Sequence, residues 1–87
     1  MPVGWRITKD HFATPAEPTR EGIGSGNHLP DDKFIYEWQT FDDDGGLCYS
    51  GIATDETFAP LDFSAADVGA TYIKFRRRGS NDPWAIL

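Results

Sequence analysis

The clearest alternation of apolar and polar positions runs over residues 34–52, on both sides of an acidic turn. Because successive side chains of a strand point to opposite faces, each half of this stretch has two faces. One face of the first half is aromatic and predicts a buried surface: Phe34, Tyr36, Trp38 and Thr40. The other face is mixed: Ile35, Glu37, Gln39 and Phe41. The stretch therefore predicts a β-hairpin on which the rest of the fold is built.

The turn and the return half of this hairpin have their own pattern. The turn is the run Asp42-Asp43-Asp44-Gly45-Gly46. Asp bonds its own backbone in turns, and Gly adopts positive φ without steric cost. In the return half, one face holds Leu47, Tyr49 and Gly51, and the other holds Cys48, Ser50 and Ile52. Since the loop is longer than a two-residue turn, we expect a β-bulge beside it.

Three further segments alternate and are predicted to be strands: residues 4–9, 71–77 and 84–87. In the second, Ile73 and Phe75 should point into the core, while Lys74 and Arg76 point outward. Residues 58–63 are apolar with one Pro and should pack on the sheet without joining a central strand. Residues 64–67 resemble a capping box and precede a Gly, which predicts one short helical turn.

Residues 13–32 contain six Pro and Gly residues and no apolar period. They predict a Gly/Pro-rich loop or a disordered insertion within a single small domain, residues 1–87. We therefore predict a mainly β fold. It is a small antiparallel sheet of four to five strands, a meander or a partly open barrel, with one short helical turn.

Charge and composition narrow the class of protein. The chain has 87 residues and a net charge of −6, which favours solubility and repels bulk nucleic acid and anionic lipid. A single Cys excludes an intramolecular disulfide and suits a reducing compartment. The first residues lack the apolar core of a signal peptide, and no apolar run is long enough to span a membrane. We expect a cytoplasmic protein without a membrane partner, as a monomer or weak dimer.

Half of the Lys and Arg residues lie in or just after the predicted strand at residues 71–77: Lys74, Arg76, Arg77 and Arg78. Three of these and a nearby tyrosine are the candidate binding residues: Tyr72, Lys74, Arg76 and Arg78. Cationic side chains with a nearby aromatic ring contact phosphates and bases, so RNA is one possible partner of this strand. A protein is the second possible partner of this strand. In the third interpretation the strand lies at the sheet edge, where its charges block aggregation and pair with the chain's own acids.

Other candidate chemistry is weaker. The residues Asp42-Asp43-Asp44-Gly45 offer carboxylates to calcium, but the acids are contiguous and no distal Glu follows, so a solvated turn is favoured. The Gly-rich residues 22–26 lack the strand, the helix and the Lys of a phosphate-binding loop. Nothing in the spacing gives a base to Cys48 or Ser50, and the two histidines, His11 and His28, do not form a zinc motif. We predict no catalytic residue, no metal site and no cofactor.

The turn and return strand resemble a DDDGxxxYxG pattern, carried here by residues 42–45 with Tyr49 and Gly51. The pattern occurs in short, mostly uncharacterised bacterial proteins, and residues 5–11, 58–62 and 69–73 are similar to the same group. Ala70 departs from it, since Cys is expected there. The resemblance implies a small cytoplasmic bacterial protein and supplies no catalytic residue.

These observations favour a small non-enzymatic interaction or accessory protein. The first alternative is a ligand-binding or metal-binding protein, or an enzyme, that uses the loop acids and His28. The second is an RNA-binding β module that uses the basic strand. In either alternative, a ligand that binds the folded state should raise the melting temperature.

Overall fold

The computed structural model describes residues 3–12, 16 and 19–87. It contains one antiparallel sheet of five strands in the order β1-β3-β2-β4-β5, and the sheet is open rather than closed into a barrel. The strands are β1 (Trp5–Asp10), β2 (Tyr36–Phe41), β3 (Leu47–Ala53), β4 (Tyr72–Arg77) and β5 (Ala85–Ile86). A 3-10 turn (Asp31–Lys33) precedes β2, and the helix α1 (Ala59–Val68) connects β3 to β4. The prediction of a mainly β, antiparallel fold is confirmed.

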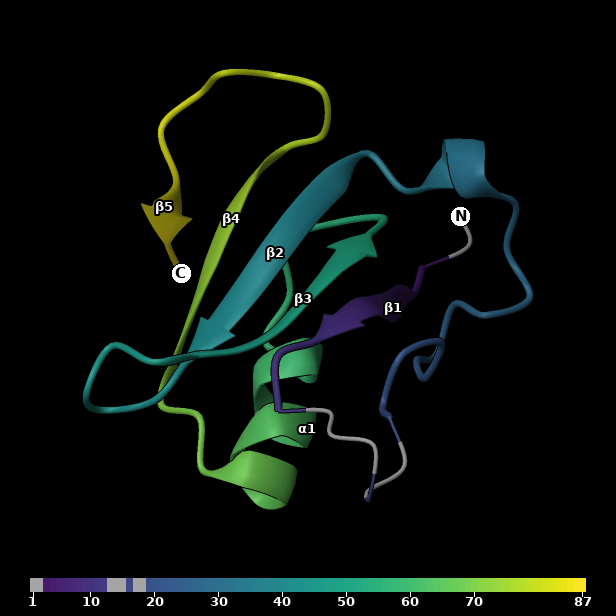
Figure 1. Cartoon of the computed structure of the whole chain (residues 1–87). Helices are drawn as coiled ribbons and strands as arrows, with labels where there is room; N and C mark the ends of the chain where they lie inside the picture. The colour runs from purple at the N-terminus through teal and green to yellow at the C-terminus, as the bar shows by residue number, and fades with distance from the viewer. Residues whose placement is uncertain (1–2, 13–15, 17–18) are drawn as a thin grey trace.

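The hairpin of β2 and β3 forms the centre of the sheet, as its alternation predicts (Figure 1). Trp38 pairs with Gly51 on one side and with Phe75 of β4 on the other. The ladder shifts register between Thr40 and Phe41, so Cys48 is the extra residue of a bulge next to the acidic turn. The expected bulge is therefore present.

One face of the sheet is covered by α1 and contains the core. Its buried residues are Trp5, Ile7, Trp38, Tyr49, Ala53, Ile73 and Phe75. The helix contributes partly buried apolar residues, and Phe63 packs against both Trp5 and Tyr49. Trp38 is fully buried, meets Trp5 edge-on and donates its indole N–H to the carbonyl of Ile52. The aromatic face predicted for the hairpin is thus the surface onto which the helix packs.

The helix begins earlier than the predicted turn at residues 64–67. Pro60 lies in its first turn, where the missing N–H of proline costs no intrahelical bond. Ser64 does not cap the helix; it lies inside it, fully buried, and donates to the carbonyl of Pro60 over 2.8 Å. Gly69 ends the helix in the left-handed conformation, as predicted.

The loop before the 3-10 turn lies along the outer edge of β1. Ile7 donates to the carbonyl of Ile23, Gly22 donates to the carbonyl of Ile7, and Gly26 donates to the carbonyl of Trp5. A Cβ atom on Gly24 would collide with the carbonyl oxygen of Trp5, so a glycine permits this close approach. Residues 13–15, 17 and 18 lie outside the described residues. Whether this segment is mobile in solution stays a prediction.

Candidate functional site

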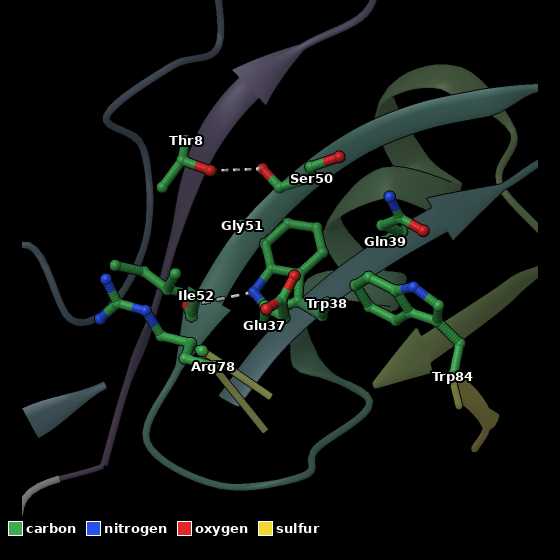
Figure 2. A pocket seen from close by; sticks show the side chains of 10 residues that line it. Thr8, Glu37, Trp38, Gln39, Ser50, Gly51, Ile52, Arg78 and Trp84 are labelled. Atoms are coloured by element: carbon green, nitrogen blue, oxygen red, sulfur yellow. Dashed lines mark hydrogen bonds between the residues drawn. The ribbon is translucent and has the colours of Figure 1, made fainter. Parts of the chain in front are cut away.

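The face of the sheet opposite α1 carries an open hollow of about 210 Å³. Its lining comes from three strands and from the connection between β4 and β5: Thr8, Glu37, Trp38, Gln39, Ser50, Gly51, Ile52, Arg78, Gly79 and Trp84. Figure 2 shows Thr8 and Ser50 together on one side and Trp84 on the other, with Glu37 and Gln39 of the central strand between them. This face is called the open face below.

A second bulge shapes one side of the hollow. In the β1–β3 ladder Ile7 pairs with Gly51 and Lys9 with Ser50, so Thr8 is the extra residue. Its hydroxyl donates to the carbonyl of Ser50 over 3.4 Å. Bulges redirect side chains and are common beside binding sites. Here the bulge places a hydroxyl at the rim of the hollow.

His11 hydrogen-bonds Ser50, with 2.9 Å between its Nε2 and the Ser50 Oγ. Partial burial and then the charge of Lys9 lower the pKa of His11, which favours the neutral ring. The nearby carboxylate of Asp10 accepts from the backbone N–H groups of Phe12 and Arg20, at 2.8 and 2.9 Å. The serine thus has a neighbouring base that the sequence spacing did not reveal. Among the described residues, no carboxylate hydrogen-bonds His11 to complete a triad.

Trp84 forms the opposite wall and is positioned by Arg76. The guanidinium of Arg76 lies over the indole ring at 4.5 Å from its centroid. The same side chain approaches Glu37, with 3.4 Å between Nε and Oε1. This contact is an ion pair without hydrogen-bond geometry, since Arg76 Nε is buried and has no hydrogen-bond partner among the described residues.

Gln39 lies at the middle of the central strand on the open face. It is half-buried and pairs in register with Ser50 on one side and Lys74 on the other. The side chains of Trp38 and Thr40 hydrogen-bond within the protein. The Gln39 amide has no such partner among the described residues, so its N–H groups and its oxygen remain available to a ligand.

The predicted basic residues are divided between two positions. Lys74 lies with its ammonium 5.0 Å from the ring centroid of Phe41, which stacks on Tyr72 at 5.1 Å. Arg78 lines the hollow, but its guanidinium donates to the carbonyls of Asp31 and Phe34 at 3.1 and 2.9 Å. The four residues therefore do not form one uniform basic patch.

β4 is not an edge strand, because β2 and β5 flank it. The interpretation of its charges as edge protection is therefore wrong for this strand. Pairing with the chain's own acids is observed: Arg76 pairs with Glu37, and Arg78 approaches Asp31 at 3.6 Å.

The remaining candidates lie apart from the hollow. The Asp42 carboxylate accepts from the N–H groups of Asp44 and Gly46, so it organises its own turn. Cys48 is fully buried, and burial followed by the charge of Asp42 raises the pKa of its thiol. His28 is exposed in the loop. Within the described ranges, no group of three or more His, Cys, Asp or Glu side chains is arranged to hold a metal ion.

No protein-family model, curated protein or solved structure matches this chain. The resemblance to the DDDGxxxYxG proteins and the bacterial origin that it implies therefore stay predictions. In the part of the chain that the structure describes, every helix is too short or too polar to cross a lipid bilayer.

Sequence reasoning missed Glu37, Gln39 and Trp84 as site residues. The signal for the first two was present, since the alternation of the hairpin placed them together on its mixed face. No local sequence pattern indicated that Trp84 belongs to the site. It depends on the path of the chain after β4, which brings the ring to Arg76.

Proposed function

We propose that this chain is a non-enzymatic interaction protein of the cytoplasm, and that it binds a segment of a protein partner on the open face. The observation that carries the proposal is the contrast within the sheet. One face is closed by α1, whereas the other is hollowed and presents the half-buried polar side chains of Glu37 and Gln39. Binding sites combine apolar and aromatic walls with a few placed polar groups, and here Trp84 supplies an aromatic wall beside Glu37 and Gln39.

Peptide chemistry suits this lining. A peptide group has one donor and one acceptor, and the Gln39 amide offers the complementary pair. Thr8 and Ser50 add hydroxyl groups, and Trp84 adds an apolar wall for a partner side chain. Aromatic residues of this kind often dominate the energy of protein interfaces.

The RNA-binding alternative depends on the stacked pair of Phe41 and Tyr72 with Lys74 above it. Bases stack on the faces of aromatic rings. The ring of Phe41 already contacts both Tyr72 and the ammonium of Lys74, and the net charge of −6 disfavours approach to phosphates. These facts favour a protein partner, and RNA becomes an outcome of the test.

The test is selection of binders from a random peptide library displayed on phage, with the purified chain as bait. Binding of the selected peptides is then mapped by NMR. We expect shifts at the Gln39 side-chain amide and the Trp84 indole N–H, and loss of binding in Trp84→Ala. The matched control is Phe58→Ala, which removes an aromatic ring that is 53% exposed and lies at the start of α1.

Two results would contradict the proposal. One is that the selected peptides perturb only residues outside the open face. The other is that none binds, while a random single-stranded RNA pool is captured at low salt and shifts the same resonances. The RNA capture is repeated with the double variant Lys74→Gln, Arg76→Gln. Arg78 is kept, because it donates to two backbone carbonyls and its replacement would disturb the fold.

A further inference from the structure

The arginine side chains around the hollow are matched by acids of the protein. Arg76 approaches Glu37 at 3.4 Å, and Arg6 and Arg78 approach the two carboxylate oxygens of Asp31 at 3.5 and 3.6 Å. Arg78 also donates to two backbone carbonyls. These guanidinium groups therefore already have oxygen partners within the protein.

Lys74 differs from these arginines. It is half-buried in the middle of β4, and its ammonium lies 5.0 Å from the ring centroid of Phe41. This contact holds the ammonium in place without neutralising its charge. Lys74 forms no ion pair and no side-chain hydrogen bond with the described residues. Because an ammonium has three N–H donors and no acceptor, its donors remain available to a ligand.

Three cross-strand pairs of β2 and β4 follow one another on the open face, and the middle pair has no acidic partner. The pair on one side joins the opposite charges of Glu37 and Arg76, and the pair on the other side stacks two aromatic rings. The middle pair is Gln39 and Lys74, and both side chains present N–H donors. Cβ atoms of such a pair lie about 4.5–5.5 Å apart, so one ligand group can reach both side chains.

A partner that covers the open face removes water from the ammonium of Lys74. Burial of an unmatched charge is unfavourable, and a second positive charge placed opposite it is more unfavourable still. The net charge of −6 belongs to the whole chain, and salt screens exposed charges that lie beyond about 10 Å. The charge of the partner at this position is therefore set by the groups that it contacts.

We propose that the partner segment carries an acidic side chain, Glu or Asp, whose carboxylate binds Lys74 and the Gln39 side-chain amide at the border of the hollow. The carboxylate accepts a charge-assisted hydrogen bond from the ammonium and a second hydrogen bond from the amide N–H. Its single negative charge matches the single positive charge of Lys74. This inference rests on the proposed function and specifies the chemistry of the partner at the same site.

The test uses three capped five-residue peptides, Ser-Leu-Xaa-Leu-Ser, in which the central residue is Glu, Gln or Lys. Gln keeps the shape of Glu and removes its charge. The peptides are titrated into the whole chain, and binding is followed by NMR at the Gln39 side-chain amide and at the Lys74 side chain. We expect the Glu peptide to bind at least about fivefold more tightly than the Gln peptide, and the Lys peptide to bind most weakly.

Variants of β4 locate the charge preference. In Lys74→Gln the Glu peptide should bind no better than the Gln peptide, and in Lys74→Glu the order should reverse, so that the Lys peptide binds most tightly. The matched control is Arg77→Gln, which removes the same charge from the same strand. Arg77 is exposed and has the parity of the core residues of β4, opposite to that of Lys74. Arg77→Gln should keep the preference of the parent, which separates a contact at Lys74 from an effect of total charge.

The outcomes separate this inference from the proposed function. If library-selected peptides bind at Gln39 and Trp84 but the Glu and Gln peptides bind equally, the open face binds peptides and the acidic partner is wrong. A preference for the Lys peptide in the parent, or a preference for Glu that survives in Lys74→Gln, overturns the inference in the same way. If no peptide from the library or the panel perturbs the open face, the proposed function itself fails.

Discussion

The two faces of the sheet differ in how their polar groups are satisfied. On the face under α1, the hydroxyl of Thr40 lies 3.2 Å from that of Ser64, and the Tyr49 hydroxyl donates to Asp67. Each of these groups has an internal partner. On the open face, the half-buried Gln39 side chain makes no hydrogen bond to the described residues, and the buried Arg76 Nε has no hydrogen-bond partner there. Polar groups under α1 thus serve the architecture, whereas the open face combines internally bonded groups, such as Ser50 and Arg78, with the Gln39 amide, which remains available.

The largest expected loss of stability comes from a core residue on the face that α1 covers. Trp38→Ala removes a fully buried indole that packs on Trp5, and it should cost about 3–5 kcal/mol of unfolding free energy. That approaches the whole stability of a small domain, on the order of 5 kcal/mol. Urea denaturation followed by circular dichroism measures it, and Trp38→Phe should retain part of the stability if the alanine variant does not fold. A parent-like urea midpoint in Trp38→Ala would show that the indole is not a core residue.

Adjacent residues of β3 allow a direct comparison of the faces. A Cβ atom at Gly51 would collide with the carbonyl oxygen of Arg6 and with the indole of Trp38. Gly51→Ala should therefore destabilise the protein by about 1–3 kcal/mol. Ser50→Ala lies on the open face and should change stability by less than about 0.5 kcal/mol. Similar melting temperatures for the two variants would remove the distinction between the faces.

The buried hydroxyl pair under the helix should behave as a unit. Ser64→Ala leaves the Thr40 hydroxyl without its helix partner, and we expect a loss of about 1–2 kcal/mol. Thr40→Val should cost a similar amount, because it also removes the acceptor of the Tyr49 N–H at 3.2 Å. In a double-mutant cycle the combined variant should lose less than the sum. Strict additivity would mean that the two hydroxyl groups do not interact.

A small change in stability is expected at Asp67, an exposed residue of α1 on the side of the sheet that the helix covers. Hydrogen bonds from Arg20 and then Tyr49 lower the pKa of Asp67 below its ordinary value of 3.8. The stabilisation is thus present above pH 3.8 and is lost as the pH falls through the lowered pKa. Asp67→Asn should lower the melting temperature slightly at pH 6, since an exposed pair contributes about 0–1 kcal/mol. The melting temperatures of the parent and the variant should converge as the pH falls below the lowered pKa of Asp67; a constant gap would exclude the charge as its cause.

The strands could be predicted because their alternation is local. Trp38, Ile73 and Phe75 are buried where their parity placed them, and Lys74 and Arg76 lie on the opposite face. The start of α1 was missed because Pro60 looked like a break in a sheet-packing segment, although proline suits the first helical turn. The hollow was missed because it depends on distant segments. The bulge at Thr8 and the position of Trp84 exist only after β1 and β5 have joined the sheet.

The backbone of residues 22–26 has a consequence for self-association. It occupies hydrogen-bonding groups of Trp5 and Ile7 on the outer side of β1, whereas β5 at the other end of the sheet leaves Ile86 66% exposed. Strand-to-strand growth of a sheet into a filament requires two receptive edges on every molecule. With β1 occupied, pairing of β5 with its copy in a second molecule uses the receptive edge of both. Such an assembly would stop at two subunits. The loop at β1 would therefore limit edge-to-edge association of the sheets to a dimer.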